Sequence, residues 1–284
     1  MNAFRAGLAI ALVSVLMACG RAAAPPDRST RTAERGGPVD STIPAGPFGI
    51  SIRRGRALLV ATRDSLPGHV GNRLRCSSCH LDAGRRASAS WVGVFARYPQ
   101  YRSRSNSVET IEYRINDCFR RSMNGKALPA DGPDMRDIVA YLAFLSAGVA
   151  VGPPQSSGSG RLARWGALTA DTAAGARAYG QSCARCHGAR GDGTALAPPL
   201  WGPQSYNIGA GMARVRTAAA FIRDNMPFDA PGSLTDQQAV DLAAYVNAQP
   251  RPDFPDKIRD WPNGDAPPDA AYRTFGAGRA QPQR

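Results

Sequence analysis

The stretch Cys76-Ser77-Ser78-Cys79-His80 decides the fold of this chain, because it occurs a second time as Cys183-Ala184-Arg185-Cys186-His187. Cys-x-x-Cys-His is the attachment signature of a c-type haem: both cysteines bond to the porphyrin and the histidine binds the iron. A redox dithiol or half of a zinc site would need only Cys-x-x-Cys, so the added histidine argues against both. The residues assigned in this way are Cys76, Cys79, Cys183 and Cys186 for covalent attachment, and His80 and His187 for the iron. The sequence therefore predicts two covalently bound haem c groups.

Each haem motif lies in a segment with the plan of a small helical cytochrome domain. The helical spacing of apolar residues predicts an entry helix and an exit helix in each half. These helices are expected over residues 50–61 and 135–146 in the first half, and over 172–181 and 234–248 in the second. Ser233 or Thr235 is expected to cap the last of them.

This pattern predicts an all-α fold of two class I cytochrome c-type domains, each with one haem. The domains are expected over residues 48–150 and 166–250, joined by a linker at 151–165 that is rich in Pro, Ser and Gly. The tail over 251–284 is Pro-rich and irregular, and two fates are open for it: it wraps across both domains, or it frays.

The N-terminal segment has the features of a bacterial export signal. Residues 1–19 carry a positive start and an apolar stretch shorter than the about 20 residues of a membrane span. The signal ends in Leu16-Met17-Ala18-Cys19, which matches a lipobox and predicts lipidation of Cys19. Ordinary cleavage near residues 22–24 is the alternative. We expect a periplasmic protein, lipid-anchored to a membrane, with residues 20–47 as a disordered tether.

The formal net charge is +13, and nearly all of the positive residues are Arg, with Lys only at 126 and 257. Such charge would suit nucleic acid, but no nucleic-acid-binding module is present and an exported protein does not meet nucleic acid. The charge therefore favours an anionic small substrate or an acidic redox partner.

The second half offers a distal iron ligand at Met226, which lies 39 residues after His187 and is followed by Pro227. Met-Pro is a usual setting of a distal haem ligand, because the proline holds the loop against the ring. Met212 is the rival, with loop or core packing as its other role. Methionine ligation raises the reduction potential and suits a haem that accepts and passes on electrons.

The equivalent position of the first half is Cys118, which lies 38 residues after His80. Met123 and Met135 are available as ligands but lie off the register of the repeat, and His69 reads as a loop histidine. A thiolate ligand lowers the potential, and a thiolate beside iron is also a nucleophile toward sulfur compounds. The two halves therefore predict an active-site haem with His80 and Cys118, and an electron-exit haem with His187 and Met226.

Several longer stretches resemble the dihaem thiosulfate dehydrogenases, also called tetrathionate synthases, over most of the mature chain. The first domain is also similar to the thiolate-ligated subunit of the sulfur-oxidising complex. The stretches that carry the resemblance are Val70 to Leu74, Arg114-Ile115-Asn116-Asp117-Cys118, Arg121 to Lys126, Gly209 to Arg214, and Asp260-Trp261-Pro262. The resemblance implies oxidation of two thiosulfates to one tetrathionate, with two electrons passed to an external acceptor such as a small cytochrome c or a high-potential iron–sulfur protein.

The family places its chemistry at the His/Cys haem, so the resemblance implies a catalytic role for Cys118. Arg104 and Arg114 match family positions that line the substrate pocket, and Ser122 matches a neutral donor there. Arg121 and Lys126 are weaker candidates for substrate binding, because they are close in sequence only. Two other functions stay open: tetrathionate reduction at the same site, and a membrane-tethered electron-transfer subunit without its own substrate.

The sequence departs from some relatives just before the second distal ligand. Those relatives have a lysine there and exchange ligands with redox state, whereas this chain has Asn225. We therefore expect ligation by His187 and Met226 in both oxidation states.

Overall fold

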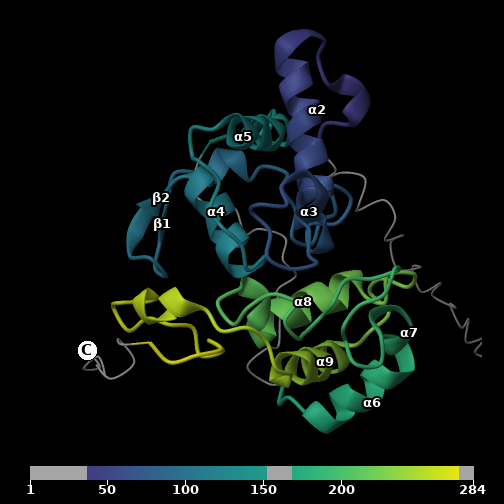
Figure 1. The fold of residues 1–284 in the computed structure, drawn as a ribbon. Coiled ribbons are helices and arrows are strands. Elements are labelled where there is room, and N and C mark those ends of the chain that lie inside the picture. The colour runs from purple at the N-terminus through teal and green to yellow at the C-terminus, as the bar shows by residue number, and fades with distance from the viewer. Residues whose placement is uncertain (1–36, 152–167, 275–284) are drawn as a thin grey trace, which may run out of the picture.

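The computed structural model describes residues 37–151 and 168–274 as two helical units and a tail. In Figure 1 the first unit, purple to teal, lies above the green second unit, and the yellow tail runs beneath the first unit. The export signal with Cys19 lies outside the described residues, as does the predicted linker from residue 152 on. Within the described ranges, no helix has the length and apolar character to cross a membrane.

The first unit is built on two helices that cross closely. Its elements are the 3-10 turn Asp40–Thr42, α2 (Gly46–Val60), α3 (Thr62–Ser65), the 3-10 turns Cys76–Ser78 and Phe95–Arg97, β1 (Gln100–Arg102), β2 (Ser107–Glu109), α4 (Ile111–Arg121) and α5 (Pro133–Leu145). Helices α2 and α5 are the predicted entry and exit helices (Figure 1). Gly55 allows their contact, because a Cβ there would lie 1.8 Å from the Asp137 carbonyl oxygen. Ile52, Ile138 and Leu145 are fully buried in the core beneath them.

Two parts of the first unit differ from the prediction. Strands β1 and β2 form a small antiparallel hairpin, with Tyr101 opposite Val108, that the helical pattern did not predict. Residues 37–47, the last part of the predicted tether, are described in the structure, where Asp40 pairs with Arg85 at 2.6 Å and with Arg56 at 2.9 Å. These ion pairs and the early start of α2 order the segment.

The second unit repeats the plan, with an entry helix of 11 residues where the first unit has one of 15. It contains α6 (Thr172–Ser182), α7 (Ala184–His187), the 3-10 turn Gly211–Ala213, α8 (Val215–Asn225) and α9 (Asp236–Ala248). Thr235 caps α9, and its side chain accepts from the Gln238 N–H in a capping box. Gly175 of α6 approaches α9 so closely that a Cβ would lie 2.1 Å from the Asp241 carbonyl oxygen. The entry and exit helices of both halves are thus confirmed, within a few residues at their ends.

The two units and the tail are joined by hydrogen bonds across long sequence separations. Asn72 donates to the Ser205 carbonyl at 3.0 Å, which links the approach to the first haem motif to the second unit. The tail carries the 3-10 turn Pro255–Arg259, after which the Trp261 N–H donates to the Arg104 carbonyl at 2.8 Å. The described part of the tail also contacts the second unit, where the Ile208 N–H donates to the Pro252 carbonyl at 3.0 Å, so it lies across both units, the first of the two courses left open for it.

Candidate active site

The first haem motif presents its histidine in the form that binds iron. His80 stacks on Trp91, with ring centroids 4.7 Å apart, and its Nδ1 lies 2.6 Å from the Ala89 carbonyl oxygen. Because a carbonyl only accepts, Nδ1 carries the proton and Nε2 keeps its lone pair for a metal. Burial lowers the pKa of His80 to about 4, so the ring is neutral. Cys76 and Cys79 are free thiols, and burial raises the pKa of each to about 12.

The second motif has the same arrangement. The Nδ1 of His187 lies 2.8 Å from the Pro198 carbonyl oxygen, and Cys183 and Cys186 are free thiols. Met226 directly follows α8 and is half-buried. Each motif therefore offers two thiols and one imidazole Nε2, which is the donor set of a covalent haem.

The rest of the structure also fits a haem better than a bare metal ion. In the described ranges no three His, Cys, Asp or Glu side chains are grouped to hold a metal, whereas a porphyrin itself supplies four ligands. Buried guanidinium nitrogens without a hydrogen-bond partner occur in the same ranges at five arginines, Arg56, Arg86, Arg120, Arg214 and Arg251. A buried donor without a partner is costly, and the carboxylates of haem propionates would supply partners for those nitrogens that face a haem.

The other candidate distal ligands of the two haems have packing or loop contacts of their own. Met123 and Met135 are 2% and 0% exposed among the core side chains of the first unit. Met212 packs between the cores of both units. The Nδ1 of His69 lies 3.1 Å from the Ala127 carbonyl oxygen, as expected for a loop histidine. Cys118 and Met226 stay the predicted ligands.

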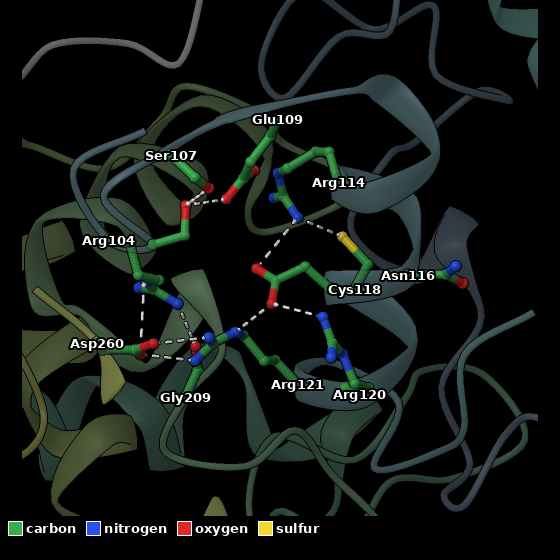
Figure 2. A network of polar contacts seen from close by, with 12 residues as sticks. Arg104, Ser107, Glu109, Arg114, Asn116, Cys118, Arg120, Arg121, Gly209 and Asp260 are labelled. Carbon is green, nitrogen blue, oxygen red and sulfur yellow. Dashed lines mark hydrogen bonds and ion pairs between the residues drawn. The ribbon is translucent and has the colours of Figure 1, made fainter. Parts of the chain in front are cut away.

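Helix α4 aims a guanidinium at the sulfur of Cys118. Arg114 lies one turn before Cys118 on the same face, and its Nη1 donates to Cys118 Sγ at 2.9 Å (Figure 2). The negative charge of the cysteine raises the pKa of Arg114 above its usual range, which outweighs the effect of burial. The positive charge of Arg114 therefore lies at hydrogen-bond distance from the sulfur of the candidate nucleophile.

A chain of ion pairs continues from Arg114 into the tail (Figure 2). Asp117 Oδ2 lies 3.9 Å from Arg114 Nη1, and the other oxygen of Asp117 accepts from Arg121 Nε. Burial would raise the pKa of Asp117, but Arg121 and Arg114 outweigh burial and hold that pKa below its usual range. Arg121 also donates through Nη1 and Nη2 to the two oxygens of Asp260, at 2.7 and 2.8 Å.

Arg104 reaches the same network from the loop between β1 and β2. Its Nη1 donates to the Gly209 carbonyl at 2.6 Å, and its Nε lies 3.9 Å from Asp260 Oδ2. Its guanidinium carbon lies 4.5 Å from the centre of the Trp261 ring. Burial lowers the pKa of Arg104 to about 10, and the nearby charge of Arg121 adds to this effect. Arg104 is therefore held by backbone and side chains of the second unit and the tail.

The remaining predicted residues divide into two groups. Ser122 directly follows α4, and its backbone N–H donates to the Cys118 carbonyl at 2.8 Å, so it lies one helical turn after the candidate nucleophile. Lys126 is exposed, and in the described parts of the chain no hydrogen bond or ion pair joins its side chain to the network. Arg121 is only 9% exposed and its nitrogens are taken by carboxylates, so it is not placed to meet substrate directly.

Sequence reasoning missed Asp117 and Asp260 as members of the site. Asp117 follows Arg114 by three positions and precedes Arg121 by four, a spacing that brings all three together on a helix and was available as a signal. Asp260 lies 139 residues from Arg121, and no local pattern predicts that pairing.

Comparisons with known proteins agree with this architecture. Residues 70–151 match the SoxA/TsdA cytochrome c domain family, and residues 170–246 match cytochrome C oxidase, cbb3-type, subunit III. The chain is 45% identical to a thiosulfate dehydrogenase of Psychrobacter arcticus over 240 residues, which are 82% of this chain and 73% of the relative. It is 44% identical to that of Allochromatium vinosum over 234 residues, 78% of this chain and 86% of the relative.

A solved structure gives the same result. The thiosulfate dehydrogenase (TsdBA) from Marichromatium purpuratum superposes with a TM-score of 0.73 and is 41% identical in sequence. The match covers 78% of this chain and 50% of that longer chain. The predicted fold of two helical cytochrome c domains is confirmed, and with it the two covalently bound haem c groups. The chain belongs to the thiosulfate dehydrogenase family.

Proposed function

We propose that this protein is a thiosulfate dehydrogenase, which joins two thiosulfates into tetrathionate: 2 S2O3²⁻ → S4O6²⁻ + 2 e⁻. The observation that carries the proposal is the contact of Arg114 with Cys118, in a chain whose relatives have this name. A pure electron carrier needs neither a thiolate at this register nor a guanidinium aimed at it. Cys118 is the nucleophile of this proposal, and the site of Met226 and His187 is the route by which electrons leave.

Both substrates are dianions, so the site must overcome their mutual repulsion. Two unit charges about 4 Å apart repel by about 4 kcal/mol at an effective dielectric constant of about 20, and two dianions contain several such pairs. Arg114 and Arg104 supply fixed positive charge, and the hydroxyl of Ser122, which directly follows α4, is the proposed neutral donor. Because these groups are held by the fold, they cost little reorganisation when anions bind.

The sulfur chemistry is written on Cys118 so that charge and electrons balance. In the first step, the thiolate and the outer sulfur of thiosulfate form an S–S bond: Cys–S⁻ + S2O3²⁻ → Cys–S–S–SO3⁻ + 2 e⁻. In the second step, the outer sulfur of another thiosulfate attacks the substrate-derived sulfur, which returns Cys–S⁻ and releases S4O6²⁻. The haems, when bound, supply the one-electron acceptors for the two electrons. A small cytochrome c or a high-potential iron–sulfur protein is the proposed external acceptor.

The function is tested with the haem-loaded, fully oxidised protein under anaerobic conditions. Thiosulfate is added with ferricyanide as acceptor, and tetrathionate and ferrocyanide are both quantified. The proposal expects one tetrathionate for every two ferricyanides reduced. Thiosulfate that remains unconsumed, in a protein whose haems are readily reduced by a small cytochrome c, would instead assign the chain to electron transfer.

The ligands of the second haem give a separate prediction. Asn225 directly precedes Met226, is fully buried, and its amide donates to the Phe221 carbonyl at 3.1 Å, so this position supplies no amine that could replace Met226. We expect Met226 to ligate in both oxidation states. The near-infrared absorption band of methionine-ligated ferric haem should therefore be present in the oxidised protein and absent from Met226→Gly. Loss of the band in the oxidised wild type would show ligand exchange.

We also propose that the protein is exported and anchored in a membrane through lipid on Cys19. The Leu16-Met17-Ala18-Cys19 sequence supports this proposal, since stable anchoring follows when several acyl chains are placed on one residue. We expect the wild type in the membrane fraction and Cys19→Ser in the soluble fraction of the producing cells. Haem staining of both fractions measures the distribution, and a wild type found only in the soluble fraction would contradict the proposal.

A further inference from the structure

Arg121 stands in the network as a residue held by carboxylates. Its Nη1 and Nη2 donate to both oxygens of Asp260, at 2.7 and 2.8 Å, and its Nε donates to Asp117. The guanidinium carbon also lies 4.2 Å from the centre of the Phe254 ring. A bidentate pair with a buried carboxylate fixes both the position and the orientation of an arginine. The tail therefore sets where the third nitrogen of Arg121 points.

The third nitrogen, Nε, donates to Asp117, and a second arginine, Arg114, lies close to the same carboxylate. Asp117 Oδ2 lies 3.9 Å from Arg114 Nη1, too far for a hydrogen bond, whereas its other oxygen is hydrogen-bonded to Arg121. The same Nη1 of Arg114 donates to Cys118 Sγ at 2.9 Å. A carboxylate that moved onto Arg114 would compete with the cysteine sulfur, and with any substrate anion, for one set of donors.

The position of Asp117 thus determines whether the Arg114 guanidinium can donate to the Cys118 sulfur and to a substrate anion. We propose that Arg121 is a positioning residue: held by Asp260 of the tail, it keeps the Asp117 carboxylate off Arg114, which stays available to Cys118 and to a sulfur oxyanion. The part concerning the oxyanion rests on the proposed function. The part concerning Cys118 does not, because it follows from the network alone (Figure 2).

Tail residues outside the direct pair support this role. Asp260 is 4% exposed and also accepts a hydrogen bond from the Tyr272 hydroxyl, whose pKa is raised by burial and by that bond. The next residue, Trp261, donates its N–H to the Arg104 carbonyl at 2.8 Å. Asp260 is therefore also held by groups other than Arg121, and we expect it to remain in place when Arg121 is replaced.

Arg121→Gln is the first variant, made in the haem-loaded protein. Asp117 then loses its hydrogen-bond partner and moves onto Arg114. We expect KM for thiosulfate to rise about tenfold or more, because the anion loses one charge-assisted hydrogen bond from Arg114. The change in kcat should be smaller. Arg120→Gln is the matched control, because Arg120 is the neighbouring arginine and lies 4.0 Å from Asp117 without hydrogen-bonding it. Its effect on KM should be much smaller.

The decisive variant adds Asp117→Asn to Arg121→Gln. An amide carries no charge and competes for Arg114 much more weakly than a carboxylate, so KM should return to near the wild-type value. Asp117→Asn alone, which keeps Arg121, should not raise KM. A double variant that is as impaired as Arg121→Gln, or a raised KM in Asp117→Asn alone, would overturn the proposal by showing that Arg121 acts on substrate itself or through general stability.

A second readout does not depend on turnover. Hydrogen bonds to a ligating sulfur weaken its donation to iron and raise the reduction potential. The potential of the first haem should therefore fall in Arg121→Gln and recover in the double variant. An unchanged potential in Arg121→Gln would overturn the positioning role, even in a protein that oxidises thiosulfate. Conversely, the expected first-haem potentials in both variants can be found in a protein that does not oxidise thiosulfate. That result would support the positioning role of Arg121 and reject only the proposed function.

Discussion

Cys118→Gly is expected to abolish thiosulfate oxidation while both haems stay covalently attached. The variant removes the sulfur that forms the S–S bond, whereas attachment depends on the four cysteines of the two motifs. Loss of an enzyme's nucleophile costs many orders of magnitude, so kcat should fall at least about a thousandfold. Anaerobic tetrathionate formation with ferricyanide measures the rate, and the absorption of the denatured protein counts the haems.

Cys118→Met is the control that separates nucleophile from iron ligand. A thioether can fill the distal position of the first haem but cannot form a covalent sulfur adduct that turns over. We expect this variant to be as inactive as Cys118→Gly, with a higher first potential. Turnover within about tenfold of the wild type in either variant would remove Cys118 from the chemistry.

Arg114→Gln is expected to have the second-largest effect. The change removes a donor at 2.9 Å from Cys118 Sγ and the charge that would meet the substrate anion, so two charge-assisted interactions are lost. At about 1.5–3 kcal/mol each, they predict a fall in kcat/KM of about a hundredfold or more. Because nearby negative charge raises the pKa of Arg114, this loss should be the same across neutral and mildly alkaline pH.

Arg120→Gln again serves as the comparison for Arg114→Gln. Arg120 lies on the same helix and near the same aspartate, but its guanidinium carbon lies 5.6 Å from the centre of the exposed Tyr113 ring. Arg120→Gln should therefore reduce kcat/KM by only a few-fold. Equal losses in the two variants would mean that the general positive charge of α4 matters, and that the contact with Cys118 does not.

The parts of this site that follow local rules could be predicted from the sequence. The haem motifs are contiguous, and the internal repeat led from Met226 to Cys118 as its counterpart. The contact of Arg114 with Cys118 needs only helical spacing once α4 is known to span 111–121. The haem motifs and the contact of Arg114 with Cys118 depend on neighbours a few residues apart, and the fold did not override them, whereas iron ligation by Met226 and Cys118 stays a prediction.

The parts that join distant segments could not be predicted. Its nearness to Cys118 in sequence makes Arg121 a candidate for substrate binding. In the structure, however, Arg121 forms an ion pair with Asp260, which lies 139 residues away. The order of residues 37–47 likewise depends on the pairing of Asp40 with Arg85, 45 residues further on. A composition rich in Pro, Ala and Gly predicts disorder only where no such partner exists.

The central claim, a covalent sulfur adduct on Cys118, is tested most directly by mass spectrometry of the peptide that contains it. The second step of the proposed cycle needs no acceptor in reverse, so tetrathionate added to the haem-loaded protein should transfer an S–SO3⁻ group to Cys118 and release thiosulfate. We expect this added mass on the Cys118 peptide alone, and we expect excess thiosulfate to remove it. A Cys118 that stays unmodified, in a preparation that still forms tetrathionate from thiosulfate, would contradict it.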